Sequence, residues 1–274
     1  QADVIVDALF GTGLDRDASG DYLAAIHAIN TAGKPVLAVD IPSGLNADTG
    51  KAMGAAVHAD VTLSFIARKQ GLYTGDAAAC RGVLKFTDLG IAQRILDQVP
   101  AASDLLQIQS LVGLLSKRLR TAHKGHYGHL LVVGGDYGYA GSVRMCAETA
   151  ARSGAGLVTV ATRHEHAMLI PSARPELMAS GVDEAADLQA MLERASVVAI
   201  GPGLGQSDWS AALLAKVLDT RLPLVVDADA LNLLAQDPVH RDNWVLTPHP
   251  GEAARLLGIS VAEVEADRFA AAVA

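Results

Sequence analysis

The sequence has few aromatic residues, only two cysteines and no excess of basic charge. Aromatic residues make up 4% of it, and the formal net charge is −8. A nucleic-acid surface needs a stripe of Lys and Arg to displace counterions, and no such cluster is present. Cys80 and Cys146 have no paired spacing, so we expect buried free thiols rather than a disulfide or a metal site.

Long hydrophobic runs are also missing. No apolar stretch approaches the roughly 18 residues of a membrane span, and residues 1–10 lack the charged region and cleavage site of a signal peptide. These absences favour a cytoplasmic, globular protein with no nucleic-acid or membrane partner. They do not determine the oligomeric state, and a homo-oligomer is one of the possible states.

One pattern recurs along the chain: a short, β-branched apolar run stops at a glycine-rich or Asp-rich turn. The runs are Val4–Val6, Val36–Val39, Val197–Ile200 and Leu224–Val226. Continuous apolar runs are typical of parallel strands buried on both faces, and ligands of such sheets bind beyond the carboxyl ends of the strands. Because the pattern occurs in two separate blocks, it predicts two three-layer α/β domains with mainly parallel sheets and two nucleotide-type sites.

Composition changes between the two blocks. Residues 91–122 hold a polar stretch, an amphipathic segment from Leu105 to Leu119 and several basic residues, which predicts a linker with a short helix. The predicted domains are residues 1–90 and 123–274. A strand from Asp3 to Leu9 begins almost at the first residue, and a last helix starts at Val261. We therefore expect each domain to be only partly contained in this sequence.

In the first block, two aspartates follow predicted strands. Asp7 and Asp40 each stand where a carboxylate would point at a ligand or metal, although a lone Asp at such a place is more often a turn or cap residue. Gly11-Thr12-Gly13 lacks the third glycine of the dinucleotide fingerprint and is a weak phosphate-loop signal. Ser43 adds a hydroxyl that suits a hard cation such as an alkali ion, with an ordinary tight turn as the alternative.

In the second block, the turns again follow predicted strands. Residues 201–205 offer a ligand a surface free of side chains, and a plain strand-to-helix turn explains them equally well. Asp227 and Asp229 suit a hydrated cation, with a helix cap as the alternative for Asp229. His249 lies between two prolines on a stiff turn, and we favour a ligand contact over a surface-loop histidine.

Two further groups in this block are assigned no chemistry. Three histidines have no Cys or carboxylate partner, which argues against a zinc site at His123, His126 and His129. Three methionines are most simply core residues, namely Met168, Met178 and Met191.

The first block resembles the carboxyl-terminal half of NAD(P)H-hydrate epimerases. The matching motifs are Asp7-Ala8-Leu9-Phe10-Gly11-Thr12-Gly13-Leu14, Val39-Asp40-Ile41-Pro42-Ser43-Gly44, Ala59-Asp60-Val61-Thr62-Leu63-Ser64-Phe65 and Lys69-Gln70-Gly71-Leu72. The resemblance implies a Rossmann-like domain in which Asp40 binds the hydrate and transfers the proton at the epimerising carbon. It implies that Asp7 and Ser43 bind potassium. It also implies that the substrate's phosphates are held by Gly11, Thr12, Gly13, Leu14, Asp15, Arg16 and Asp17.

The second block resembles the ADP-dependent NAD(P)H-hydrate dehydratases of the ribokinase-like superfamily. The matching motifs include Lys124-Gly125-His126-Tyr127-Gly128, Gly134-Gly135-Asp136, Ala140-Gly141-Ser142, Gly154-Ala155-Gly156, Arg174-Pro175-Glu176, Asp227-Ala228-Asp229 and Thr247-Pro248-His249-Pro250-Gly251-Glu252. By this resemblance Glu252 and Asn232 lie near magnesium and the phosphates of ADP or ATP, the phosphoryl donor. The hydrated nicotinamide nucleotide would be contacted by Ala140, Gly203, Gly205 and His249. The Gly-x-Gly-Asp motif of that family does not occur before Ala274.

Together the two resemblances imply a bifunctional repair enzyme. It would interconvert the R and S hydrates of NADH and NADPH and dehydrate the S form at the expense of ADP or ATP. A phosphoryl group turns a poor hydroxyl leaving group into a good one, which explains a kinase-like fold in a lyase. The alternatives are a small-molecule kinase of the same superfamily and a protein that binds nicotinamide nucleotides without turnover.

Overall fold

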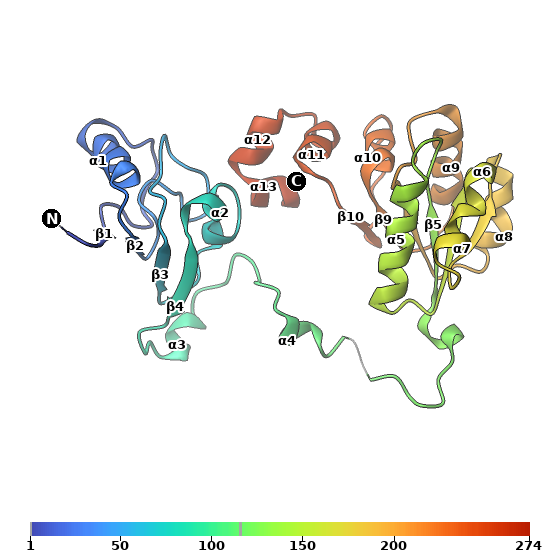
Figure 1. Ribbon diagram of the computed structural model, residues 1–274, viewed down its shortest axis with the longest axis horizontal. Helices are drawn as coiled ribbons and strands as arrows, with labels where there is room; N and C mark the ends of the chain where they lie inside the picture. Colours follow the sequence, from blue (N-terminus) through green and yellow to red (C-terminus); the bar gives the residue numbers. More distant parts are fainter. Residues whose placement is uncertain (1, 115–116) are drawn as a thin grey trace. The chain divides into compact units, whose positions relative to one another are not determined.

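The computed structural model describes residues 2–114 and 117–274. The chain forms two compact units, one of residues 1–115 with 261–274 and one of residues 116–260. Each unit is built around a single parallel β-sheet (Figure 1). Within the described residues, no helix is both long enough and apolar enough to cross a membrane.

The first unit has four strands in the order β1-β2-β3-β4. They are β1 (Ile5–Asp7), β2 (Val36–Val39), β3 (Val61–Phe65) and β4 (Val83–Thr87). All neighbouring pairs are parallel. The helical segments of this unit are α1 (Gly20–Thr31), η1 (Gln70–Tyr73), α2 (Ala77–Cys80), α3 (Gln93–Leu96), α4 (Ile108–Leu111), α12 (Val261–Ala266) and α13 (Arg268–Val273).

Only one face of this sheet is packed by the described residues. Ile26 of α1 is fully buried against Val36 and Ala38 of β2. On the other face, a row of apolar side chains in register crosses all four strands, and none of them is buried: Val6, Leu37, Val61 and Val83. Successive residues of each strand point to opposite faces of the sheet. One face is therefore packed in the core, and the other carries apolar side chains that no described helix covers.

The second unit has six strands in the order β10-β9-β8-β5-β6-β7, all parallel. They are β5 (His129–Val133), β6 (Leu157–Thr162), β7 (Met178–Gly181), β8 (Val197–Ile200), β9 (Leu224–Val226) and β10 (Trp244–Leu246). Since β6 and β7 lie on one side of β5 and the later strands on the other, the strand order reverses between β5 and β8. Ligands of doubly wound sheets bind at such a switch point, beyond the carboxyl ends of the strands.

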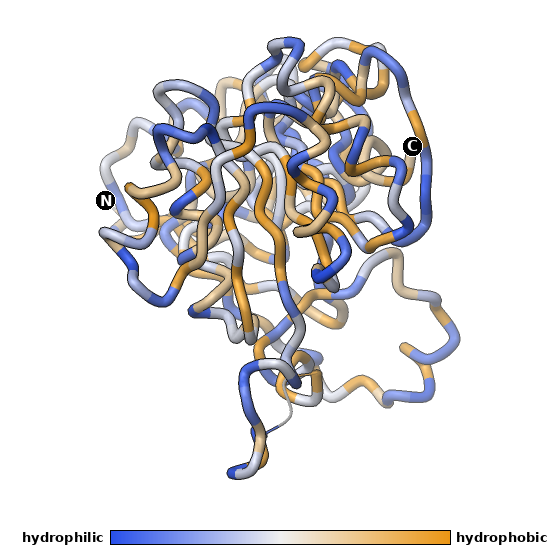
Figure 2. The backbone as a smooth tube through the Cα atoms, turned by 90° about the vertical axis from the view of Figure 1, so that its right-hand side faces the viewer, coloured by the Kyte–Doolittle hydropathy of each residue, from blue (hydrophilic) through white to orange (hydrophobic). Residues whose placement is uncertain are grey.

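Helices cover both faces of this six-stranded sheet. On one face, α9 (Asp208–Leu218) and α10 (Ala228–Leu234) bury Leu213 and Leu231 against the strands. On the other, α5 (Ala140–Ser153) and α7 (Leu169–Ala173) bury Val143 and Ile170. The other helical segments of this unit are η2 (Lys124–Tyr127), α6 (His164–Ala167), η3 (Ala185–Leu188), α8 (Gln189–Leu192) and α11 (Pro250–Leu257). In Figure 2 the hydrophobic colour follows the strands, as expected of a sheet between two helical layers.

The predicted parallel α/β class is confirmed, whereas several local predictions are wrong. The strand expected from Asp3 to Leu9 is only the three residues of β1. The short helix predicted in the linker is present, by contrast, as α4 in the segment from Leu105 to Leu119, of which residues 115–116 lie outside the described part of the chain. The predicted last helix is divided into α12 and α13.

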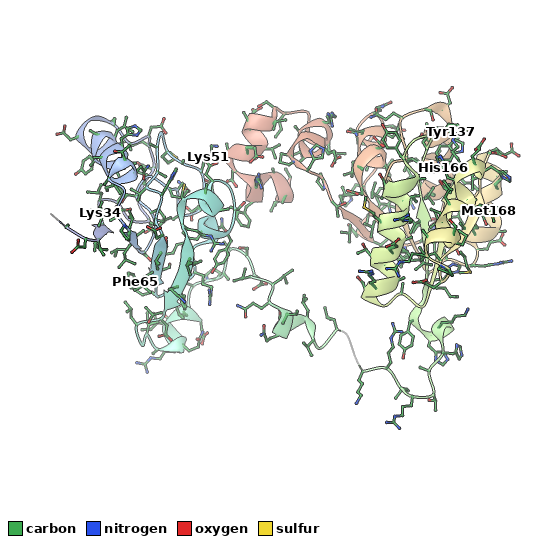
Figure 3. The ribbon with its side chains drawn as sticks, in the orientation of Figure 1. Lys34, Lys51, Phe65, Tyr137, His166 and Met168 are labelled. Atoms are coloured by element: carbon green, nitrogen blue, oxygen red, sulfur yellow. The ribbon has the colours of Figure 1, made fainter. Side chains whose placement is uncertain are left out.

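Two of the three methionines are not core residues. Met168 is 77% exposed and stands at the surface of its unit in Figure 3, and Met178 is 42% exposed on the edge strand β7. Only Met191 packs against the core. Cys80 is buried as predicted and Cys146 only partly, and burial raises the pKa of both thiols.

Candidate functional site

Asp40, directly after β2, has a left-handed backbone with φ +70°. This region is costly for most residues other than glycine, and Asp tolerates it better than branched side chains do. Its Oδ1 atom accepts hydrogen bonds from Phe65 N (3.0 Å) and Ser64 Oγ (3.2 Å) and pairs with the ammonium group of Lys69. None of the described residues donates to Oδ2. One carboxylate oxygen is thus fixed and the other is left for a ligand.

Asp7 and Ser43, predicted to bind potassium, are in contact and fully buried. Ser43 N donates to Asp7 Oδ2 (2.8 Å) and Leu9 N lies 3.4 Å from Oδ1, while Ser43 Oγ accepts from Phe10 N (2.9 Å). Within residues 2–114 and 117–274, no Lys, Arg or His pairs with Asp7. A buried carboxylate that meets only neutral donors favours a nearby cation, so this oxygen-rich pair fits an alkali ion.

The loop predicted to bind phosphates, residues 11–17, begins beside this pair. All of its residues are exposed except the partly buried Leu14, whose carbonyl accepts from the Asn46 side chain (3.2 Å). A Cβ added at Gly11 or Gly13 would meet no atom within 4 Å. Packing therefore does not require these glycines, and their backbone is open to an approaching ligand.

At the switch point of the second unit, the loops after β5 and β8 are joined by hydrogen bonds. Gly135 N donates to Pro202 O (3.1 Å) and Asp136 N to Gly203 O (2.7 Å). The helix α5, which starts at Ala140, follows the first of these loops. The predicted substrate contacts Ala140, Gly203 and Gly205 are thus carried by two loops that hold one another.

Packing explains the glycines after β8. Gly203 and Gly205 have φ values of +59° and +72°. A Cβ at Gly203 would lie 2.6 Å from Tyr139 Cβ, and one at Gly205 would lie 2.9 Å from Asp136 Oδ2. The tight turn therefore accounts for these glycines, and a ligand contact through their backbone stays a prediction.

Asp136 is a member of this site to which the sequence analysis gave no role. Its Oδ1 accepts from Arg163 Nε (2.7 Å) and Tyr137 N (2.9 Å), and Ser207 Oγ lies 3.4 Å from Oδ2. Burial would raise the pKa of Asp136, but Arg163 and the Tyr137 N–H outweigh it and hold that pKa below the ordinary value of 3.8. Arg163 is 27 residues away in sequence, so no local motif could reveal the pair.

Aromatic rings enclose the Arg163 guanidinium. Its carbon lies 3.9 Å from the ring centroid of Trp209 and 4.6 Å from that of Tyr137. Tyr137 in turn meets the His166 ring edge-on at 6.0 Å, and the two are neighbours in Figure 3. Cation–π stacking of this kind fixes the orientation of the cation and hence of the Asp136 carboxylate.

Asp227 and Asp229 are engaged within the protein. Thr247 Oγ1 donates to Asp227 Oδ1 (2.8 Å), and Gly205 N donates to Asp229 Oδ2 (2.9 Å). The helix cap that was the alternative for Asp229 is not formed, because the N-cap residue of α10 is Asp227, which makes no side-chain cap bond. The described residues contain no group of three or more His, Cys, Asp or Glu side chains that could hold a metal ion. The two aspartates instead tie together the loops after β8, β9 and β10.

His249 is the N-cap residue of α11, on the stiff turn predicted from its flanking prolines. Its Nδ1 accepts from Gly251 N (3.0 Å), and its Nε2 lies 3.0 Å from Glu252 Oε1. Glu252 is buried and its Oε2 accepts from His249 N (2.9 Å). The imidazole is 63% exposed and held at both nitrogens, so its orientation is set before any ligand arrives.

The residues expected near magnesium both have partners within the protein. Glu252 is occupied by His249, and Asn232 Oδ1 accepts from Arg255 (2.8 Å). Magnesium needs several free oxygen ligands in near-octahedral geometry, which these two side chains do not supply.

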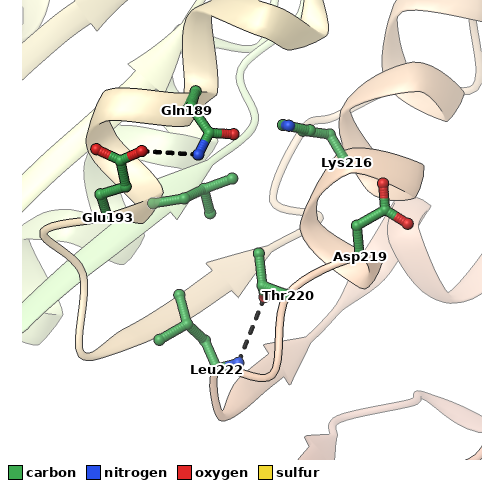
Figure 4. Close-up of a pocket in the computed structure, with 7 residues that line it drawn as sticks. Gln189, Glu193, Lys216, Asp219, Thr220 and Leu222 are labelled. Carbon is green, nitrogen blue, oxygen red and sulfur yellow. Dashed lines mark hydrogen bonds between the residues drawn. The ribbon is translucent and has the colours of Figure 1, made fainter.

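Two hollows of the second unit lie away from these loops. Figure 4 shows one of about 260 Å³, lined by Gln189, Leu192, Glu193, Lys216, Asp219, Thr220 and Leu222. A neighbouring hollow of about 570 Å³ shares Asp219 with it. Both are lined by residues just before β9, and the neighbouring one also by residues just before β10, whereas the switch-point loops follow the strands. We therefore define the candidate site by the loop network.

Two family models match this chain. Residues 130–274 match the family model of NAD(P)H-hydrate dehydratase, and residues 1–71 match that of the YjeF-related protein N-terminus. A bifunctional NAD(P)H-hydrate repair enzyme of Coxiella burnetii is 55% identical over 99% of this chain and 56% of its own length. That of Escherichia coli is 49% identical over 97% of this chain and 52% of its own length. The chain thus spans about half the length of the curated relatives it matches.

Two solved structures resemble part of the chain. A hypothetical protein from Streptococcus mutans, SMU.573, has a TM-score of 0.55 at 33% identity, covering 58% of this chain and 60% of its own. The ADP/ATP-dependent NAD(P)H-hydrate dehydratase from Bacillus subtilis, co-crystallised with ATP and Mg²⁺, has a TM-score of 0.50 at 32% identity, covering 56% of this chain and 55% of its own. Because a single family model covers more than half of it, the chain belongs to the NAD(P)H-hydrate dehydratase family, with a YjeF-related segment preceding the matched region as in the bifunctional NAD(P)H-hydrate repair enzymes.

Proposed function

We propose that the intact protein repairs NADH and NADPH that have become hydrated at the nicotinamide ring. The first unit would interconvert the R and S hydrates, and the second would dehydrate the S form with ADP or ATP. The observation that carries this proposal is the half-fixed carboxylate of Asp40 beside the buried Asp7–Ser43 pair, in the same chain as a dehydratase-family switch point.

In the first unit, Asp40 is suited to move the proton. Inverting the hydroxyl-bearing carbon requires its C–O bond to break and to form again on the other face, with one proton given to the departing hydroxyl and one taken from the returning water. A carboxyl group with one free oxygen can perform both transfers: in its protonated form it gives the proton to the departing hydroxyl, and as the carboxylate it takes one from the returning water. The backbone of residues 11–17 would bind the phosphates. Asp7 and Ser43 would hold a potassium ion, which supplies positive charge next to the phosphates when it is bound.

In the second unit, the switch-point loops would hold the hydrated nicotinamide nucleotide. Ala140, Gly203 and Gly205 line the loop ends, and the fixed imidazole of His249 supplies a polar contact. Transfer of a phosphoryl group from ADP or ATP to the hydroxyl would let that oxygen leave as phosphate while the ring loses a proton, restoring the dihydronicotinamide. ADP or ATP, with magnesium on its phosphates, would be the second substrate. We assign none of the described residues to its binding.

Separate variants test the two halves in the intact protein. Asp40→Asn should stop R-to-S conversion and leave dehydration of the S hydrate unchanged. His249→Ala should weaken dehydration and leave epimerisation unchanged. Chromatography of the two hydrates and of the NADH formed measures both rates. If both variants repair at the wild-type rate, the two residues bind without taking part in turnover and the proposal fails.

A further inference from the structure

Lys69 contacts Asp40, and the resemblance to the epimerases assigns it no role. Its Nζ donates to Asp40 Oδ1 and to Phe65 O (2.8 Å) and lies 3.5 Å from Ser64 Oγ. The side chain is only 16% exposed. An ammonium group has three protons to donate, and three oxygen atoms surround this one. Lys69 is therefore held firmly between the end of β3 and the carboxylate of Asp40.

The same carboxylate oxygen also accepts from two groups of β3. Phe65 N and Ser64 Oγ complete the set of three donors on Asp40 Oδ1. The backbone of Asp40 is at φ +70°, a conformation that persists only where surrounding contacts hold it. Of the three donors only Lys69 carries a charge, so its bond to Asp40 Oδ1 is also an ion pair, whereas the bonds from Phe65 N and Ser64 Oγ have neutral donors.

We propose that Lys69 is the positioning residue of the epimerase centre: it holds Asp40 Oδ1 so that Oδ2 alone faces the hydrate for proton transfer. This inference rests on the proposed function of the first unit. It adds a residue to that centre and states how it acts, through Asp40 and not on the substrate. A displacement of the reacting oxygen by about 1 Å costs on the order of 100-fold in rate, which sets the size of the expected effect.

Lys51 provides a matched control. It forms another Lys–Asp ion pair in the same unit, with 3.2 Å between its Nζ and Asp76 Oδ2, and its side chain is 44% exposed. Lys51 and Phe65 are both labelled in Figure 3. A Lys51→Met variant removes the same charge from the same unit without touching Asp40.

The kinetic test compares three variants of the intact protein. Lys69→Met should lower the epimerase kcat about 100-fold with KM changed less than about threefold, because positioning acts on the transition state. Lys51→Met should keep both constants within about twofold. Lys69→Ala should be as slow as Lys69→Met and should recover about tenfold with added ethylammonium, a cation that can replace the missing group. Recovery requires space, so Lys69→Met, whose side chain fills the site, should not respond.

A second measurement does not depend on turnover. Phe65 N–H is protected by its bond to Asp40 Oδ1, so Lys69→Met should speed its exchange with solvent about fivefold, the loss expected when a hydrogen bond of ordinary strength is weakened. Lys51→Met should leave that exchange unchanged. If the wild type does not epimerise the hydrates but Phe65 N–H exchanges faster in Lys69→Met, the proposed function fails, whereas the contact by which Lys69 positions Asp40 is supported. An unchanged exchange rate, or an epimerase kcat of Lys69→Met equal to that of Lys51→Met, would overturn the role of Lys69.

Discussion

Arg163 and Asp136 join the ends of β6 and β5 through a hydrogen bond of 2.7 Å from Nε to Oδ1. Both side chains are 15% exposed, and the guanidinium lies between two aromatic rings. Both side chains are therefore largely shielded from water. The pair should contribute more to the free energy of unfolding than an ordinary surface ion pair does.

Replacing Arg163 should destabilise the second unit. Arg163→Met leaves the mostly buried Asp136 carboxylate without its cation, and we expect a loss of about 2 to 3 kcal/mol in the free energy of unfolding. Urea denaturation followed by Trp209 fluorescence measures it. The control is Arg144→Met, which breaks the more exposed pair with Glu148 (3.0 Å) and should cost less than about 0.5 kcal/mol. Equal losses in the free energy of unfolding of the two variants would mean that the Arg163–Asp136 pair contributes no more than an exposed ion pair.

The same pair predicts a dependence of stability on acid. The pKa of Asp136 is below its ordinary value of 3.8 in the folded protein, so the unfolded chain takes up a proton at higher pH than the folded one. The stabilisation is complete above the unfolded value and is lost as the pH falls through the folded one. Between pH 5 and pH 3 the free energy of unfolding should therefore decline more steeply in the wild type than in Asp136→Asn. Parallel curves would contradict the assignment.

Sequence patterns found the strands because buried parallel strands are continuous apolar runs. Val197–Ile200 and Leu224–Val226 became β8 and β9 without change of limits. The edge strands were harder: β1 is shorter than the strand predicted from Asp3 to Leu9, and β7 contains the exposed Met178, since an edge strand buries fewer of its residues. The contacts of the candidate site could be predicted only where they join residues close in sequence, as at the turn around His249.

The pairs of the site that are distant in sequence could not be predicted. Lys69 and Asp40 are separated by 29 residues, and they meet because Phe65 of β3 and Asp40 after β2 lie at adjacent strand ends. Strand register decides such contacts, and no local spacing encodes it. The φ of +70° at Asp40 is likewise invisible in the sequence, because Asp at a strand end is equally common in ordinary turns.

Gly201 should tolerate no side chain. Its φ is +125°, and an added Cβ would collide with the Asp227 carbonyl oxygen. Gly201→Ala should therefore lower the free energy of unfolding by about 3 kcal/mol or more. Gly141→Ala is the control, since its Cβ would meet nothing within 4 Å inside α5, and it should raise stability by about 0.5 to 1 kcal/mol. Chemical denaturation of both variants decides, and a Gly201→Ala protein of wild-type stability would contradict the loop packing described above.

Potassium should stabilise the first unit through Asp7. Because its buried carboxylate meets only neutral donors, the melting temperature of the wild type should rise with KCl more than with equal ionic strength of choline chloride. Asp7→Asn should abolish the difference between the two salts. Asp21→Asn, a change at an exposed carboxylate in the first turn of α1, should preserve it. A salt difference that persists in Asp7→Asn would place the cation elsewhere.

The substrate of the second unit tests the central claim most directly. The intact protein is incubated with ATP or ADP and either the mixed R and S hydrates of NADH or a pyrimidine or thiazole alcohol, and NADH and spent nucleotide are both counted. We predict that both hydrates disappear, with one nucleotide consumed for each NADH formed and none consumed with the alcohols. Nucleotide consumption with the alcohols alone, and none with the hydrates, would make the protein a small-molecule kinase and contradict the account.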